Sequence, residues 1–135
     1  MALITWNEKY SVKIKQFDDQ HKKLIDMVNE LHDAMKVGKG KDVLEKILAG
    51  LIQYTVTHFA SEERLMKLHN YPGFEQHKKE HNLLSLQVND VQKKYHEGNA
   101  ALSQSVMIFL KEWLQNHIQG TDKNYAPFLN SKGII

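Results

Sequence analysis

Four long segments of this chain repeat apolar residues at helical spacing, and most of the glycines and prolines fall between them. The segments cover about residues 18–37, 41–67, 74–97 and 101–119. In the first segment Leu24, Val28 and Leu31 illustrate the pattern, since residues three or four apart lie on one face of a helix. Short connections between long helices favour antiparallel neighbours. The sequence therefore predicts an all-α protein, an antiparallel up-down-up-down four-helix bundle.

The rest of the chain is expected to complete a single domain, because 135 residues suit one hydrophobic core. We expect three parts within residues 1–135: an ordered N-terminal arm at 1–17, the four-helix bundle at 18–120, and a C-terminal turn and tail at 121–135. The arm is expected to be ordered because Trp6 and Phe17 are too apolar for a free tail. Asp18 is predicted to cap the first helix, and Gly120 to follow the last one.

Composition excludes several kinds of protein. There is no cysteine, which rules out disulfides, thiolate metal sites and cysteine-ligated iron–sulfur clusters. A net charge of +2 is too weak to indicate nucleic acid or an acidic membrane as a partner. The longest apolar runs fall far short of the roughly 18 residues that a membrane helix needs, and the N-terminus does not resemble a secretory signal. We therefore expect a cytoplasmic protein. It is separately expected to be a monomer.

Five histidines and two carboxylates extend the apolar stripes of the predicted helices. They lie near helix starts in the first and third segments and near helix ends in the second and fourth. The seven are His21, His58, Glu62, His77, His81, His117 and Asp122. Antiparallel packing would bring these alternate ends to one level. Because buried imidazoles and carboxylates without partners are costly, the set predicts a pocket that holds two metal ions.

The donor types indicate which metal the pocket would hold. Imidazoles that bind once each, carboxylates that bridge, and a bridging oxo or hydroxo group would leave one position open on a pair of six-coordinate ions. This favours iron or manganese over structural zinc, which usually takes four ligands, and iron is preferred. The Glu-x-x-His pairs of ferritin-like oxidases are absent from the sequence. The open position predicts that the pocket binds a small ligand.

In order and spacing, the donors resemble those of the hemerythrin family. The motifs that carry the resemblance are Asp18-x-Gln20-His21, His58-Phe59-x-x-Glu62-Glu63, His77-x-x-x-His81 and His117-Ile118-x-x-x-Asp122-x-x-Tyr125. The resemblance covers nearly the whole chain, including the arm with Trp6. It implies a non-haem di-iron centre that binds O2 reversibly, for oxygen storage, transport or scavenging.

The resemblance also implies a role for each donor. In the family, three histidines hold one iron, two histidines hold the other, and two carboxylates bridge the irons beside a hydroxo group. On this chain the first set would be His77, His81 and His117, the second His21 and His58, and the bridges Glu62 and Asp122. Leu24, Trp113 and Ile118 match the positions that line the ligand cavity of the family.

Several neighbouring residues are expected to have structural roles. Phe59 is expected to pack against the donors, and Tyr125 to support the turn at Asp122. Glu63 should point about 100° away from the donors on its helix and is predicted to be exposed. The remaining histidines are expected in surface or loop positions: His32, His69 and His96.

Two other classes of function stay open on the sequence. A di-iron enzyme could consume peroxide or nitric oxide at the same position, but no further acid or base lies on the inward stripes, so no enzyme is expected. A sensor of oxygen or iron would shift an interface with a partner. Such members of the family usually carry a fused output domain, for which this chain has no room. A protein that receives O2 from this one is left open as a partner.

Overall fold

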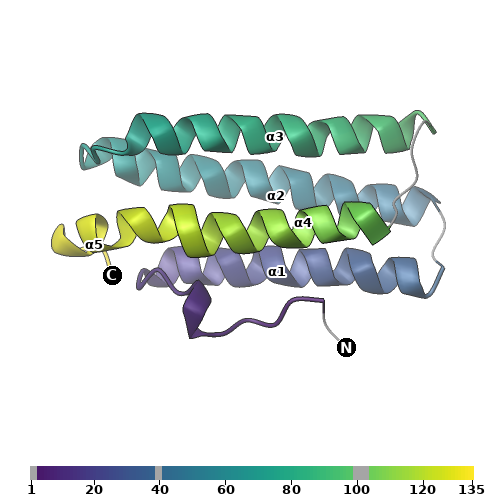
Figure 1. Cartoon of the computed structure of the whole chain (residues 1–135), viewed down its shortest axis with the longest axis horizontal. Coiled ribbons are helices and arrows are strands. Elements are labelled where there is room, and N and C mark those ends of the chain that lie inside the picture. Colours follow the sequence, from purple (N-terminus) through teal and green to yellow (C-terminus); the bar gives the residue numbers. More distant parts are fainter. Residues whose placement is uncertain (1–2, 39–40, 99–103) are drawn as a thin grey trace.

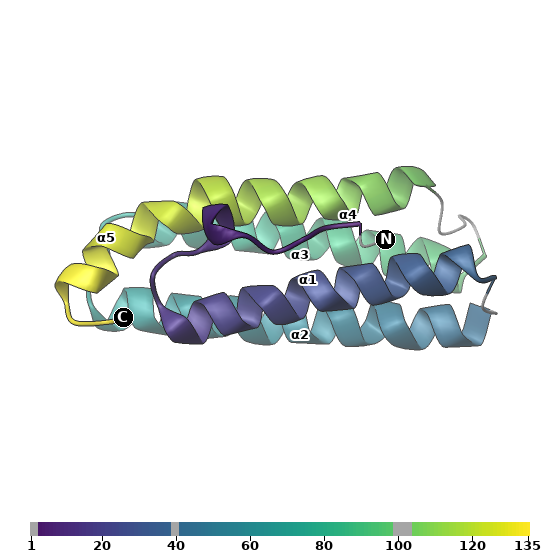
Figure 2. The same cartoon turned by 90° about the horizontal axis from the view of Figure 1, so that it is seen from below.

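The computed structural model describes residues 3–38, 41–98 and 104–135, and for residues 104–106 it describes the backbone alone. Its four long helices are α1 (Lys15–Lys36), α2 (Lys41–Leu68), α3 (Phe74–His96) and α4 (Gln104–Asn116). Successive helices run in opposite directions side by side (Figures 1 and 2). No strand occurs within these three described ranges. The prediction of an all-α up-down-up-down bundle is confirmed; its expected helix start at residue 101 falls outside the described residues.

The apolar faces of the four helices meet in one central cluster. Its buried members come from all four helices: Val28 and Leu31 from α1, Leu48 from α2, Val88 from α3 and Leu110 from α4. Each large apolar side chain buried in this way stabilises the fold by roughly 1.5–3 kcal/mol. The cluster occupies the middle of the bundle and leaves the polar donors to one end.

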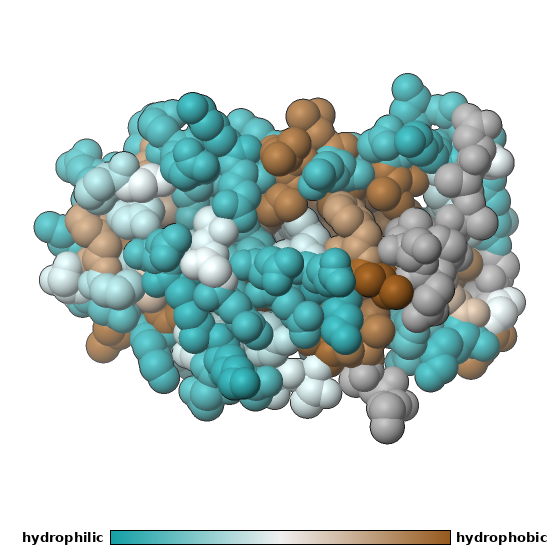
Figure 3. Space-filling view, viewed as in Figure 1, coloured by the Kyte–Doolittle hydropathy of each residue, from teal (hydrophilic) through white to brown (hydrophobic). Residues whose placement is uncertain are grey.

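The outer surface is largely polar. Figure 3 shows hydrophilic residues over most of one face and a hydrophobic area over α3 and α4. The exposed apolar side chains on these two helices include Leu83, Leu86 and Ile108. Among the residues that the structure describes, no helix is both long enough and apolar enough to cross a membrane.

The N-terminal arm is ordered, as expected, and lies along α1 and α4 (Figure 2). A short 3-10 helix, η1 (Glu8–Tyr10), interrupts it. Asn29 of α1 holds the start of the arm through two hydrogen bonds: the Ile4 N–H donates to Asn29 Oδ1 at 2.9 Å, and Asn29 Nδ2 donates to the Ile4 carbonyl at 2.8 Å. Tyr10 is buried, and its hydroxyl accepts from Gln115 Nε2 of α4 at 2.8 Å. The arm therefore joins two helices that are distant in sequence.

Asp18 does not cap α1, contrary to the prediction. The helix begins at Lys15, one turn earlier, and its N-cap residue is Ile14. The Asp18 carboxylate instead accepts a hydrogen bond from the Ser11 hydroxyl at 2.6 Å and from the Val12 N–H at 2.8 Å. The earlier start follows from the burial of Ile14 and Phe17, which places the first turn against the core. Asp18 thus ties the arm to the helix.

Replacing Asp18 with alanine is expected to destabilise the metal-free protein by about 1–3 kcal/mol. The variant would leave the Ser11 hydroxyl and the Val12 N–H without their charged acceptor. Asp19→Ala is the matched control, because Asp19 is exposed and pairs only with Lys15 in the described contacts, so its loss should cost less than about 0.5 kcal/mol. Urea unfolding of both variants measures the difference. Equal losses would contradict the role given to Asp18.

The C-terminal part differs from the predicted turn and tail. α4 continues through a π-helix, η2 (His117–Asp122), into a further helix, α5 (Lys123–Ser131) (Figure 1). The backbone at Gly120 does not adopt the left-handed conformation of a glycine that ends a helix. α5 packs on the arm and on the end of α2 through a second apolar cluster: Val12, Ile14, Phe17, Met66, Tyr125, Ala126 and Leu129. This burial explains why the chain stays helical beyond Gly120.

Candidate metal centre

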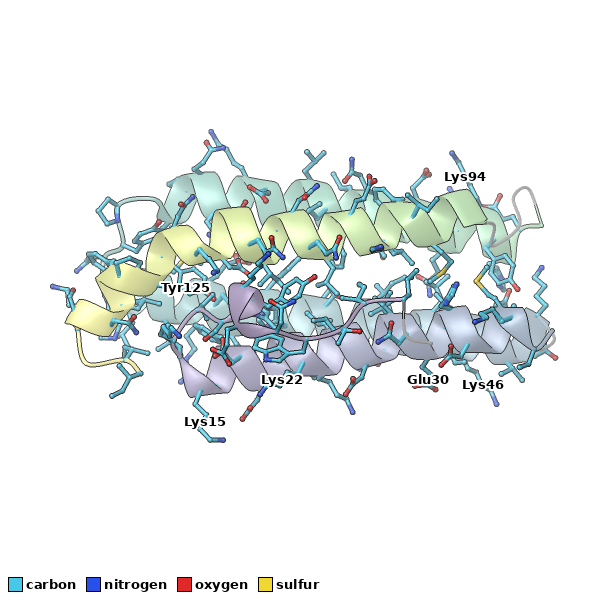
Figure 4. The ribbon with its side chains drawn as sticks, turned by 60° about the horizontal axis from the view of Figure 1, so that its bottom comes forward. Lys15, Lys22, Glu30, Lys46, Lys94 and Tyr125 are labelled. Carbon is cyan, nitrogen blue, oxygen red and sulfur yellow. The ribbon has the colours of Figure 1, made fainter. Side chains whose placement is uncertain are left out.

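All seven predicted donors meet inside the bundle, at the end where α5 lies. They come from four elements: one from α1, two from α2, two from α3 and two from η2. Each is at most 4% exposed. Figure 4 shows Tyr125 at this end of the bundle, whereas Lys15 and Lys94 point away from the helices. The seven polar side chains therefore occupy a closed site within an otherwise apolar interior.

The donors form two overlapping groups. Within each group, one ligand atom from every residue lies within 4.8 Å of the others. The larger group is Glu62, His77, His81, His117 and Asp122, and the smaller is His21, His58, Glu62 and Asp122. Both carboxylates belong to both groups. This is the arrangement expected for two adjacent metal positions that share two bridging carboxylates.

Each carboxylate turns one oxygen toward each group. Glu62 Oε1 lies 3.2 Å from His81 Nε2, and Glu62 Oε2 lies 3.4 Å from His58 Nε2. Asp122 divides its oxygens in the same way, with Oδ1 3.0 Å from His117 Nε2 and Oδ2 3.0 Å from His21 Nε2. Since these histidines present Nε2 to the carboxylates, the edge of each ring that carries Nε2 is directed at the centre of the site.

The π-helix η2 explains how His117 and Asp122 reach the same site. In an α-helix of 3.6 residues per turn, side chains five positions apart point about 140° away from each other. The wider turn of a π-helix, with its hydrogen bonds to the fifth residue, brings such a pair close to one face. His117 and Asp122 are both buried, with Nε2 and Oδ1 3.0 Å apart. The backbone irregularity therefore delivers two donors from one short segment.

The histidines and carboxylates shift one another's pKa values. Burial alone would lower the pKa of His21, but the adjoining carboxylates of Asp122 and Glu62 outweigh it and raise that pKa to about 9. The same balance raises the pKa of His77 to about 9 and that of His117 to about 10. Metal-free protein thus holds protons on these rings near neutral pH, and a metal ion must displace them.

The carboxylates shift in the opposite direction. Burial alone would raise the pKa of both Glu62 and Asp122, and the negative charge of Glu62 would raise the pKa of Asp122 further. The positive histidines around them dominate, and the pKa of each acid lies well below its usual range. Both acids are therefore ionised at neutral pH, in the state that binds a metal ion.

Unpartnered atoms supply a test of whether a metal fits this site. Among the described residues no hydrogen-bond partner exists for His21 Nδ1 and Nε2, His58 Nε2, His77 Nε2, Glu62 Oε1 and both oxygens of Asp122. Apart from His21 Nδ1, which is the outer nitrogen of its ring, these atoms face one another at ion-pair distances without hydrogen-bond alignment. One such buried atom costs about 1–3 kcal/mol, so a cluster of them needs a common ligand. Nitrogen and oxygen donors at these positions fit metal cations.

A second layer of polar residues holds the outer nitrogens of three rings. Gln20 Oε1 lies 2.5 Å from His58 Nδ1, Glu63 Oε2 lies 3.0 Å from His81 Nδ1, and Glu80 Oε1 lies 2.9 Å from His117 Nδ1. Sequence reasoning did not find these roles, and the prediction that Glu63 is exposed is wrong, since its side chain is 21% exposed. Each of the three is adjacent to a predicted donor in the sequence, and this adjacency is the one sequence feature that could have indicated their role.

The aromatic neighbours meet one expectation and modify another. Phe59 stacks on the His81 ring, with centroids 3.8 Å apart and planes within 3°, so its predicted packing is confirmed. Tyr125 donates a hydrogen bond to Glu62 Oε2 rather than acting only on the turn at Asp122. The predicted cavity-lining residues, Leu24, Trp113 and Ile118, are buried in the central cluster that also contains Phe59. Their contact with a ligand stays a prediction.

The other three histidines stand outside both donor groups. His32 and His69 are half-buried, on α1 and just after α2. His96 is exposed at the end of α3, where its Nδ1 lies 3.2 Å from Glu45 Oε1. These placements separate the buried donor set from histidines elsewhere on the molecule.

Comparison with known proteins decides the family. The sequence profile described as "Hemerythrin HHE cation binding domain" matches residues 12–129. The chain belongs to the hemerythrin family. It is similar to the bacteriohemerythrin of Methylococcus capsulatus, with 42% identity over 97% of this chain and 100% of that protein. It is also similar to the myohemerythrin of Theromyzon tessulatum, with 32% identity over 89% of this chain and 88% of that protein.

A solved structure agrees with this hemerythrin in fold. The crystal structure of wild-type hemerythrin superposes with a TM-score of 0.89 at 42% identity, covering 93% of this chain and 97% of that one. The agreement extends to the helical architecture that carries the donors of this hemerythrin.

Proposed function

We propose that this hemerythrin binds O2 reversibly at two non-haem iron ions joined by an oxo or hydroxo bridge, for oxygen storage, transport or scavenging. The observation that carries the proposal is the pair of overlapping buried donor groups that share both carboxylates. The names bacteriohemerythrin and myohemerythrin among its relatives, and the cation-binding description of its family, support it. When bound, the irons supply the electrons with which O2 is held and recover them on its release.

The two groups divide the donors between the proposed irons. Three histidines of the larger group, His77, His81 and His117, would hold one ion, and His21 and His58 would hold the other. Glu62 and Asp122 would bridge both, since each directs one oxygen to each group. The two-histidine ion would have fewer protein donors, so we place the O2 position there.

The apolar side chains beside the site would keep the ligand position dry. We propose that Leu24, Trp113 and Ile118 line it, and their exposures of 1%, 6% and 0% fit an enclosed wall. Excluding water hinders the entry of protons. Protons would favour release of O2 in a reduced form, as peroxide, and would leave the irons oxidised. Burial by these residues thus supports release of O2 unchanged rather than its consumption.

Anaerobic protein loaded with ferrous iron is expected to gain near-ultraviolet and visible absorption on exposure to O2 and to lose it under argon. Repeated cycles measured by absorption spectroscopy test reversibility. Zinc-loaded protein is the control, because Zn²⁺ has no redox chemistry and should show no change. Oxidation that argon does not reverse would contradict the proposal. Sustained consumption of peroxide or nitric oxide, well above that by free iron, would favour the enzyme instead.

The cytoplasmic location and the monomeric state expected from the sequence belong to the same proposal. Cell fractionation tests the first, and size-exclusion chromatography with light scattering tests the second. A stable oligomer would place part of the surface in an interface and would direct the search for an O2-receiving partner to the remainder.

A further inference from the structure

We infer that Glu63 and Glu80 are positioning residues that make the three-histidine position bind metal before, and more tightly than, the two-histidine position. The chain would then load its two metal ions in a fixed order. This inference rests on the proposed two-metal function and concerns the residues behind the donors rather than the donors themselves.

The three-histidine side has anionic partners behind its rings. His81 Nδ1 lies 3.0 Å from Glu63 Oε2, and His117 Nδ1 lies 2.9 Å from Glu80 Oε1. Glu80 is itself fixed by the Thr121 hydroxyl, which donates to the same oxygen at 2.6 Å. The side chains of Glu63 and Glu80 are 21% and 34% exposed, so both charges are partly shielded from water. Each carboxylate accepts the hydrogen of an outer ring nitrogen.

Within the described part of the chain, the two-histidine side has no such anionic partner. His58 Nδ1 lies 2.5 Å from Gln20 Oε1, which is a neutral amide oxygen. His21 Nδ1 is buried and has no hydrogen-bond partner among the described residues. Asp18, which precedes His21 by three residues on α1, is engaged by Ser11 and Val12 of the arm. The outer nitrogen of the His58 ring is therefore held by a neutral group, and that of the His21 ring has no partner among the described residues.

This asymmetry affects metal affinity in two ways. A carboxylate behind an imidazole fixes the ring orientation and the tautomer, and it makes the inner nitrogen a stronger donor. Losing such a partner typically lowers metal affinity by about 10–100-fold. Glu62 and Asp122 serve both positions and cannot distinguish them. The stacking of Phe59 on His81 further fixes a ring on the three-histidine side.

The order of binding has a consequence for handling of the metal. With one equivalent of metal, the three-histidine position would fill while the other stays empty. Metal loss would begin at the two-histidine position, where O2 is proposed to bind. Protein with one ion would therefore be stable and unable to bind O2.

Titration of the metal-free full-length chain with Co²⁺ under argon, against a competing chromophoric chelator, tests the inference. Two dissociation constants are expected, with the second at least about tenfold weaker. His77→Ala should abolish the tight step and His21→Ala the weak one, which assigns each step to a position. Absorption of bound Co²⁺ reports the coordination at each step independently of O2 binding.

Three charge variants then separate positioning from mere folding. Glu63→Gln and Glu80→Gln keep an acceptor oxygen but lose the charge, and each is expected to weaken the tight step by about tenfold while leaving the weak step within about threefold. Gln20→Glu should strengthen the weak step. Glu112→Gln is the control, because Glu112 is an exposed acid beside the same surface hollow as Glu80 and touches no donor ring in the described contacts.

The outcomes distinguish the inference from the function on which it rests. Two equal constants in the unchanged protein, or equal weakening of both steps by Glu63→Gln and Glu80→Gln, would overturn the ordered loading and leave the two-metal centre intact. Binding of fewer than two Co²⁺ ions by the unchanged protein would overturn the proposed centre itself. The metal-free variants are expected to unfold at the same temperature as the metal-free unchanged protein, which shows that the substitutions do not disturb the fold.

Discussion

Replacing Glu62 with alanine is expected to remove both metal ions from the protein. Glu62 directs one oxygen to His81 and the other to His58, so a single substitution removes a donor from each group. Even partners behind the donors are typically worth 10–100-fold in affinity, and loss of a shared donor should exceed about 100-fold at both positions. Elemental analysis of the purified variant should find little bound iron, and the O2-dependent absorption should be absent.

Comparison with two histidine variants makes this prediction specific. His21→Ala should remove only the metal of the two-histidine group, because His21 belongs to that group alone. His69→Ala should leave metal content and spectrum unchanged, since His69 lies in neither group. Glu62→Gln retains an acceptor for the Tyr125 hydroxyl, so it separates loss of metal from misfolding caused by loss of that hydrogen bond. Full iron content in both Glu62 variants would refute the bridging role.

Removing the metal from the unchanged protein is expected to lower Tm by roughly 20 °C or more. Each ion present at about 1,000 times its dissociation constant stabilises the folded state by about 4 kcal/mol. For a domain of this size, each kcal/mol corresponds to a few degrees in Tm. The physical source is the set of buried atoms that lack hydrogen-bond partners without the metal. Anaerobic calorimetry of metal-free and iron-loaded protein measures the difference.

A matched titration with Mg²⁺ serves as the control for this thermal shift. Mg²⁺ prefers oxygen ligands and keeps much of its water, so a histidine-rich buried site should not retain it. Addition of Mg²⁺ should leave the Tm of the metal-free protein unchanged. A shift of only a few degrees with iron would show that the donor cluster is satisfied by its own ion pairs.

The sequence allowed the bundle and the donor set to be predicted because both follow the helical period. His58 and Glu62 continue the apolar stripe of α2, and His77 and His81 begin that of α3, so side-chain direction follows from spacing alone. Alternation of helix starts and ends then predicted that the donors would meet, and the structure brings them together. Long regular helices are the elements for which such reasoning is strongest.

The features that the sequence did not reveal depart from that period. His117 and Asp122 share a face only because η2 is a π-helix, and no local pattern distinguishes this from a helix that stops near Gly120. Glu63 and Glu80 flank the apolar stripes, where exposure is the ordinary expectation. The histidine that each glutamate contacts belongs to another element, since Glu63 of α2 meets His81 of α3 and Glu80 of α3 meets His117 of η2. Such contacts require the packed arrangement of helices.

The wide turn at η2 makes the C-terminal helix part of the metal chemistry. A π-helical segment is a rare backbone form that neighbouring structure must maintain. That support comes from α5, whose Tyr125 and Leu129 are fully buried beside Phe17 and Met66. The reach of Asp122 toward the two donor groups is consequently set by apolar packing at this end of the molecule. Deleting α5 or weakening its packing would therefore shift Asp122 and weaken metal binding, although every donor residue would still be present.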